Sequence, residues 1–308
     1  MPLHPAPPLP SKLAELMPQP RGAYELVRGR HAGRELHFVD AGPRTRDAVV
    51  LVHGNPTWSF LWRKVIAALP EYRCVAPDLL GFGLSSRLPR IEDHTVDGHA
   101  DALAELIEAL DLRRVVLVGQ DWGGPLCACV GARLPDRVRG LVLANTSVFV
   151  PERPRGTWFH RFARVRGLSE LAFVGLGFPQ RTLWSVQGDK RSIRGSIARA
   201  YTWPLRRLRE RNGPLALARM VPDSLAHPSV DALRRGERWV RGYSGPAALV
   251  WGLRDPILGR ALRRHVEALP HARVTQTQAG HFLQEEVPDA LAEAIVAVWA
   301  AGEPAASA

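Results

Sequence analysis

Short runs of aliphatic and β-branched residues alternate with longer helical patterns along this chain, and this alternation most constrains its fold. Two of the runs, Val49–Val52 and Val115–Val118, both have the sequence Val-Val-Leu-Val, without a polar residue. Such uninterrupted apolar runs are typical of parallel strands that are covered on both faces. We therefore predict an α/β fold with a mostly parallel central sheet flanked by helices.

The predicted elements follow from these runs and from apolar residues at spacings of three and four. The predicted strands are Glu35–Asp40, Ala48–His53, Arg73–Asp78, Val115–Gly119, Gly140–Ala144, Ala247–Trp251 and Arg273–Gln276. The predicted helices are Thr95–Leu110, Gly123–Leu134, Gly259–Leu269 and Pro288–Ala300.

The alternation breaks between about Pro151 and Pro228. This segment is rich in Pro, Gly, Trp and Arg, has several short helical patterns and offers no convincing strand. It begins after one predicted strand and ends before the next. We therefore expect a helical cap at 151–228, inserted between a first part (1–150) and a second part (229–308) of the sheet domain.

The chain is basic, with 41 Lys and Arg against 30 Asp and Glu among 308 residues, a formal net charge of +11. A basic surface attracts phosphate, so nucleic-acid binding is one interpretation. The densest run, Arg206 to Arg211, has no aromatic residues spaced to stack on bases. We therefore interpret the arginines as solvated helix faces and expect no nucleic-acid partner.

Cysteine usage and hydropathy indicate a cytoplasmic protein. Cys74, Cys127 and Cys129 have neither metal-ligand spacing nor an even count, so we expect reduced core thiols and no metal site. No apolar run approaches the ~18–20 residues of a membrane span. The opening segment lacks the apolar stretch of a signal peptide. We expect no membrane partner.

The segment Val118–Gly124 carries the most specific signal. An apolar run ends at Gly119 and a helical pattern begins at Gly123, with Asp121 between them. Small residues two before and two after a central residue permit the sharp strand–turn–helix bend called a nucleophile elbow. At such a bend the helix dipole favours an ionised carboxylate. Alternatively, Asp121 is only the N-cap of the next helix.

Two further segments favour a catalytic site. His53–Trp58 follows a predicted strand, where this architecture needs a backbone N–H donor for an oxyanion. Asp255 follows the next-to-last strand and His281 the last one. Nucleophile, acid and histidine come in the chain order of α/β-hydrolases. Each loop leaves the carboxyl end of a strand, where ligands bind in open α/β sheets. Alone, His281 could be a core histidine and Asp255 a turn residue.

The chain resembles the α/β-hydrolases and, among them, most closely the haloalkane dehalogenases. The motifs that carry the resemblance are HGNPTWSFLWR (53–63), DLLGFGLS (78–85), VGQDWGGP (118–125), WGLRDP (251–256) and GHFLQEEVP (280–288). The D-W pair and the H-G-N-P string are the specific parts, whereas GHF and DLxGxG are shared by many relatives.

This resemblance implies a role for five residues. Asp121 would be the nucleophile, His281 the general base, and Asp255 the carboxylate that orients His281. The side chains of Asn55 and Trp122 would bind the halide, and the backbone N–H groups of the same two residues would form the oxyanion hole. The implied reaction converts a small apolar haloalkane and water into alcohol and halide through an aspartyl-alkyl ester. It needs no metal or organic cofactor.

The family has variants at two of these positions. One variant places the acid after the strand that precedes the cap, where this chain reads Leu-Ala-Asn-Thr-Ser at 143–147 without a carboxylate. Asp255 therefore remains the candidate acid. Another takes its second halide donor from a cap tryptophan, and Trp158, Trp184 and Trp203 are available. Asn55 is preferred because it matches the H-G-N variant.

Related chemistries stay open. Epoxide hydrolases share the D-W elbow but need two cap tyrosines, and Tyr201 is the only tyrosine in 151–228. The β-lactone decarboxylases keep the same carboxylate, histidine and tryptophan, so the motifs barely separate them from dehalogenases. A non-catalytic α/β-hydrolase relative that binds a small molecule is a further alternative.

Overall fold

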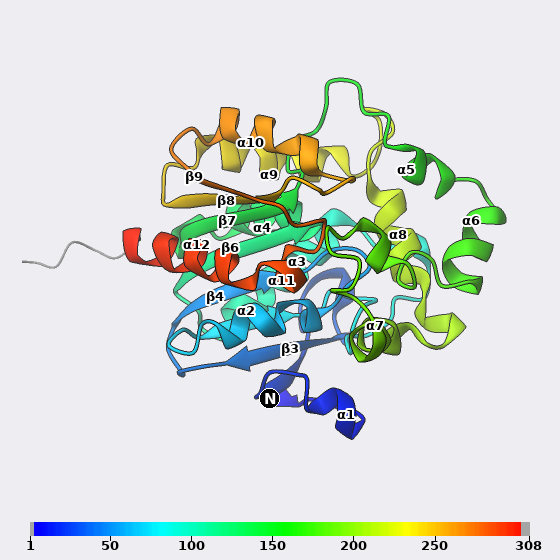
Figure 1. The fold of residues 1–308 in the computed structure, drawn as a ribbon, viewed down its shortest axis with the longest axis horizontal. Coiled ribbons are helices and arrows are strands. Elements are labelled where there is room, and N and C mark those ends of the chain that lie inside the picture. The colour runs from blue at the N-terminus through cyan, green and yellow to red at the C-terminus, as the bar shows by residue number, and fades with distance from the viewer. Residues whose placement is uncertain (1–2, 303–308) are drawn as a thin grey trace, which may run out of the picture.

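The computed structural model describes residues 3–302, and its centre is a nine-stranded sheet with helices on both sides (Figure 1). The strands are β1 (Leu3–Pro5), β2 (Arg21–Glu25), β3 (Glu35–Ala41), β4 (Asp47–Val52), β5 (Cys74–Pro77), β6 (Arg114–Asp121), β7 (Val138–Thr146), β8 (Ala247–Gly252) and β9 (Arg273–Thr277). Their order across the sheet is β1-β2-β3-β5-β4-β6-β7-β8-β9. Neighbours from β5 to β9 run parallel, whereas the pairs β1–β2, β2–β3 and β3–β5 are antiparallel. The predicted α/β class is confirmed.

All of the predicted strands are present with small shifts at their ends, and β1 and β2 are the two that were not predicted. β1 is only three residues long and contains Pro5, and β2 contains Gly22 between charged ends. Neither has a clear alternating pattern. Each is defined by pairing with its neighbour, β1 with β2 and β2 with β3, where Tyr24 of β2 lies opposite Leu36 of β3. Such pairing between separate segments leaves no pattern in the local sequence.

The helices are α1 (Ser11–Ala14), α2 (Arg63–Ala67), α3 (Val96–Ala109), α4 (Gly123–Arg133), α5 (Trp158–Phe162), α6 (Leu168–Glu170), α7 (Gly195–Thr202), α8 (Asn212–Met220), α9 (Val230–Gly242), α10 (Leu262–Ala268), α11 (Leu283–Glu286) and α12 (Pro288–Ala301). The predicted helices correspond to α3, α4, α10 and α12. The third predicted helix, α10, begins one turn later than expected, because Gly259–Ala261 forms a 3₁₀ turn before it. Thr95 caps α3 by accepting a hydrogen bond from the backbone N–H of Gly98.

Successive side chains of the central strands enter two different apolar layers. In β4, Val50 and Val52 pack in a cluster with residues of α3, α4 and α9. Val49 and Leu51 pack in the opposite cluster, with residues of α2 and α12. Because both faces of the strand are buried, the strand needs apolar residues at every position. The Val-Val-Leu-Val runs are explained by this arrangement.

The chain between β7 and α9 is helical and, in the part that the structure describes, contains no strand. Figure 1 shows it on the right, beyond one end of the sheet. Ala163, Phe173, Leu215 and Ala218 form a small apolar cluster of its own. Tyr201 and Leu217 instead pack into the two main clusters. The segment therefore has a minor core but also rests on the sheet domain.

The three cysteines are buried and have free thiols. Within residues 3–302, no helix has both the length and the apolar character that are needed to cross a bilayer.

Candidate active site

Asp121 lies at a sharp bend between β6 and α4. Its backbone φ of 52° is in the left-handed region, which costs a non-glycine residue about 1–2 kcal/mol. Glycines allow the bend: a Cβ on Gly119 would lie 2.5 Å from the carbonyl carbon of Gly123, and a Cβ on Gly123 would lie 2.0 Å from the carbonyl oxygen of Val52. The elbow geometry predicted from the glycine spacing is present, and it presents the carboxylate at the end of β6.

Backbone N–H groups hold the carboxylate of Asp121. Its Oδ1 accepts a hydrogen bond of 2.7 Å from the backbone N–H of Asn55, and the backbone N–H of Trp122 is a second donor to the carboxylate. Gly54 permits this approach, because a Cβ there would lie 2.3 Å from Oδ1. Burial raises the pKa of Asp121, although a charge on His281 and the two donors act in the opposite direction. Desolvation is thus the largest of these effects on the carboxylate.

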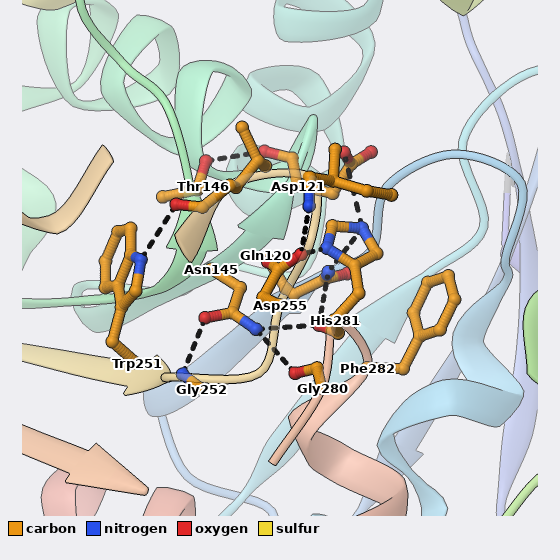
Figure 2. A network of polar contacts seen from close by, with 12 residues as sticks. Gln120, Asp121, Asn145, Thr146, Trp251, Gly252, Asp255, Gly280, His281 and Phe282 are labelled. Carbon is orange, nitrogen blue, oxygen red and sulfur yellow. Dashed lines mark hydrogen bonds and ion pairs between the residues drawn. The ribbon is translucent and has the colours of Figure 1, made fainter. Parts of the chain in front are cut away.

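The ring of His281 bridges two carboxylates (Figure 2). Its Nδ1 lies 2.9 Å from Oδ2 of Asp255, and its Nε2 lies 3.7 Å from Oδ2 of Asp121. The other oxygen of Asp255 accepts a 2.7 Å hydrogen bond from the backbone N–H of Ile257. Burial alone would lower the pKa of His281, but the charge and hydrogen bond of Asp255, together with the charge of Asp121, raise it. The arrangement holds an oriented imidazole next to the elbow carboxylate.

The two predicted halide donors have different surroundings. Trp122 is buried, and its indole N–H has no partner among the described residues, whereas the indole N–H groups of Trp58 and Trp251 donate to backbone carbonyls. The side-chain amide of Asn55 donates a 3.0 Å hydrogen bond to the carbonyl of Pro214 in α8. One N–H of the amide is therefore engaged by the segment above the sheet, and the other stays available.

A cavity of about 460 Å³ opens above the elbow. Asp121 and Trp122 lie on its wall together with residues 151 and 153–157, Val221 and Leu233. A volume of this size is typical of a site for a small molecule. Asn55, Asp255 and His281 are not among its lining residues, nor are the cap tryptophans Trp158, Trp184 and Trp203. No group of three or more His, Cys, Asp or Glu side chains within residues 3–302 is arranged to hold a metal ion.

Comparisons with known proteins agree with this geometry. Residues 47–288 match the alpha/beta hydrolase fold family. The chain is 34% identical over 277 residues to a haloalkane dehalogenase of Mycolicibacterium paratuberculosis, covering 85% of this chain and 86% of that protein. It is also 34% identical to haloalkane dehalogenase 2 of Mycobacterium tuberculosis, covering 89% of this chain and 92% of the relative. The chain belongs to the haloalkane dehalogenase family.

Solved structures of haloalkane dehalogenases have the same fold. One from Paraglaciecola agarilytica superposes with a TM-score of 0.78 at 26% identity, covering 94% of this chain and 96% of that one. Another, from Bradyrhizobium elkani, has a TM-score of 0.78 at 27% identity and covers 92% of this chain and 100% of that one. The resemblance based on the D-W pair and the H-G-N-P string is confirmed.

Gln120 is a polar neighbour of His281 that we did not single out in this dehalogenase-family chain. Its side-chain Nε2 lies 3.2 Å from Nε2 of His281 and donates to the backbone carbonyl of the same residue, also at 3.2 Å. Gln120 directly precedes Asp121, so its position in the elbow was the only available signal. Sequence alone does not say that its side chain turns toward His281.

Asn145 lies in the region 143–147 that we compared above with the family variant whose acid follows the strand before the cap. Its amide nitrogen donates to the carbonyl oxygens of Gly280 (2.8 Å) and His281 (3.0 Å), and its oxygen accepts from the backbone N–H of Gly252 at 2.8 Å. Asn145 therefore links the end of β8 to the histidine loop (Figure 2). It bonds backbone and makes no contact with the ring of His281 that would substitute for Asp255.

Residues of the helical segment also hold the histidine loop. The backbone N–H of His281 donates to the carbonyl of Val186 at 2.9 Å. The backbone N–H of Phe282 donates to the side chain of Gln187 at 2.9 Å. Residues 186–187 therefore help to fix the backbone of the loop that carries His281. Nothing in the local sequence around Gln187 indicated this contact.

Proposed function

We propose that this protein is a haloalkane dehalogenase that hydrolyses carbon–halogen bonds through a covalent ester on Asp121. The observation that carries this proposal is the ring of His281, 2.9 Å from Asp255 and 3.7 Å from Asp121. Its neighbouring carboxylates can orient the base and supply the nucleophile. The names of the relatives in sequence and structure support the reaction class.

In the proposed first step, Oδ2 of Asp121 attacks the carbon that carries the halogen. Oδ1 is held by the backbone N–H of Asn55, which leaves Oδ2 as the free oxygen. The halide departs with the bonding electron pair, and the indole N–H of Trp122 and the free amide N–H of Asn55 stabilise its growing charge. Donors aimed at developing charge lower the barrier more than they stabilise the neutral substrate.

In the second step, His281 removes a proton from a water molecule that attacks the carbonyl carbon of the ester. Oδ1 becomes the oxyanion at this stage, and it already accepts the N–H of Asn55. Asp255 stabilises the imidazolium that forms. The bond between the carbonyl carbon and the former Oδ2 then breaks, and the alkoxide leaves with this oxygen and takes the proton of the imidazolium. The products are alcohol, halide and one proton, and Asp121 is regenerated with an oxygen from water.

We assign the cap role to residues 151–228, between sheet-domain parts 1–150 and 229–308. The small apolar cluster of this segment and its share of the cavity wall support that division. We also propose that the protein has no nucleic-acid partner. Arg211 of the densest arginine run supports this, because it is buried and donates to backbone carbonyls instead of facing solvent. Three buried free thiols are in keeping with a cytoplasmic location.

The experiment is halide release from a panel of bromo- and chloroalkanes, with Asp121→Asn as the control. We expect release by the wild type and none by the variant. If the folded wild type releases no halide, the dehalogenase proposal fails, and epoxide hydrolysis and β-lactone decarboxylation are then tested by assays of their own products. In the epoxide alternative Tyr201 is not free to act as the acid, because its hydroxyl donates at 2.5 Å to buried Glu285.

A further inference from the structure

Three arginines line the open end of the cavity above Asp121. Arg153 and Arg155 lie on the segment that leads from β7 to α5, and Arg264 lies on α10. All three are exposed, and no ion pair joins them to a carboxylate of the described residues. Among the described residues that line the cavity, only Asp121 has a carboxylate. The cavity therefore has a nucleophilic carboxylate at its base and uncompensated positive charge at its opening.

Other arginines, within the helical segment between β7 and α9, are used in its structure. Arg164 pairs with Asp223 at 2.9 Å, and Arg219 pairs with Glu170. These pairs join parts of the segment to one another. The arginines at the cavity have no such partner within the described chain, so packing of the segment does not explain them.

His160 adds a neutral donor to the same cavity wall. Its Nδ1 accepts the backbone N–H of Thr157 at 3.1 Å. Burial lowers the pKa of His160 to about 4, so the ring is neutral near pH 7 and carries its proton on Nε2. This N–H has no acceptor among the described residues. An N–H donor beside arginines is suited to an oxyanion.

Most of the remaining wall of the cavity is apolar, with Ser147 and Thr157 as its polar residues. Val148, Phe149, Leu233, Ile257 and Leu258 line it. These five side chains suit an alkyl chain, because they offer it apolar contact and no hydrogen bond. The cavity thus combines an apolar path with a cationic opening.

We propose that the substrate is an amphiphilic anion, with the leaving group on one end of an alkyl chain and a terminal oxyanion, a carboxylate or a phosphate, on the other. The oxyanion lies between Arg153, Arg155 and Arg264 while the chain follows the apolar wall to Asp121. Guanidinium groups match both oxyanions through paired N–H donors. This inference rests on the proposed function, because it places the reacting carbon at Asp121.

The test compares substrates of equal chain length that differ only at the far end. With the full chain, we would measure kcat/KM for 6-bromohexanoate, 6-bromohexyl phosphate and the neutral 6-bromohexanamide. We expect at least one of the anions to exceed the amide by about tenfold, mainly through a lower KM, since charged hydrogen bonds contribute on the order of a factor of ten each. Added salt should reduce this preference.

Variants locate the anion site. Arg155→Gln and Arg264→Gln should each lower kcat/KM for the preferred anion by roughly three- to tenfold and leave the amide within about twofold. Arg273→Gln is the matched control, because this substitution removes the same charge from an exposed residue. Arg273 lies at the start of β9, away from the carboxyl ends of the strands. Loss of the preference in Arg273→Gln as well would assign it to the field of the whole protein and overturn the local site.

The outcomes separate this inference from the proposed function. Equal or better turnover of the amide, with halide release intact, would overturn the anionic substrate alone. If no bromide is released from any compound, the dehalogenase proposal fails. The anion site is then tested by titration calorimetry with unreactive decanoate. Binding that weakens in Arg155→Gln but not in Arg273→Gln would support it, and absence of binding would overturn it.

Discussion

The side-chain amide of Gln120 lies 3.2 Å from Nε2 of His281, the ring nitrogen that faces Asp121. On the other side of the ring, Nδ1 lies 2.9 Å from Asp255. A carboxylate at Nδ1 favours a proton on that nitrogen, which leaves a lone pair on Nε2 to accept an N–H of Gln120. Gln120 and Asp255 together select the tautomer that a general base requires.

Replacing Gln120 should therefore change the pH dependence of turnover. A donor at Nε2 stabilises the neutral ring, so Gln120→Ala should raise the pKa of His281 and shift the acid limb of the kcat profile to higher pH. Gln120→Glu should shift it further, because a carboxylate favours the charged ring. The shift of the acid limb is tested by measuring kcat between about pH 5 and 9, a range that spans the ordinary pKa of histidine. Coincident profiles for wild type and both variants would show that Gln120 only fills space.

The two chemical steps should respond differently to acid. The effects of Asp255 and Asp121 on His281 outweigh that of burial, so the pKa of His281 in the free enzyme lies above the ordinary histidine value. The ring is protonated when the pH falls below this raised pKa. Ester formation removes the charge of Asp121, which lowers that pKa and makes the ring a base again. We expect ester hydrolysis to decline as pH falls, while halide release in the first turnover persists.

Rapid mixing followed by mass spectrometry checks the acid effect. In acid, protein carrying one added alkyl mass on Asp121 should accumulate, and His281→Gln should accumulate the same adduct at every pH. Asp121→Asn is the blank. If His281→Gln turns over no substrate and yet never shows the adduct, His281 is not the base of the second step.

The halide donors can be separated from the tryptophans of the helical segment. Trp122→Phe should slow carbon–halogen cleavage by roughly 10²–10³, because one well-placed donor is lost at the developing charge. Asn55→Ala should act in the same direction and also lose its bond to Pro214. Trp184→Phe is the control, since Trp184 is partly exposed and does not line the cavity. Single-turnover bromide release is the measurement, and a large effect of Trp184→Phe would reverse the assignment.

A buried charge pair should contribute strongly to stability. Arg63 donates two hydrogen bonds, of 2.6 and 2.8 Å, to Glu285, which also accepts the hydroxyl of Tyr201. Glu285→Gln leaves the buried guanidinium without its counter-charge and should cost about 3–5 kcal/mol in the free energy of unfolding. Urea denaturation measures it. The double variant Arg63→Met, Glu285→Leu should recover most of the loss, and an additive double loss would contradict this explanation.

Much of the fold could be predicted because its signals are local. The Val-Val-Leu-Val runs report burial on both faces of a strand, and the glycines around Asp121 report a bend that side chains would block. β1 and β2 escaped prediction because β1 is defined by pairing with β2, and β2 by pairing with β3, and not by a pattern of their own.

By itself, the sequence determined the α/β architecture, the elbow at Asp121 and the order in which the candidate residues follow the strands. Those features depend on residues within one element or one turn. Tertiary structure alone decided that Gln120 meets His281, 161 residues away, that Gln187 holds the backbone of Phe282, and that Arg155 and Arg264 share one cavity. A side-chain amide or guanidinium can satisfy its hydrogen bonds in many ways. Only the packed chain, which removes water and brings distant segments together, selects among them.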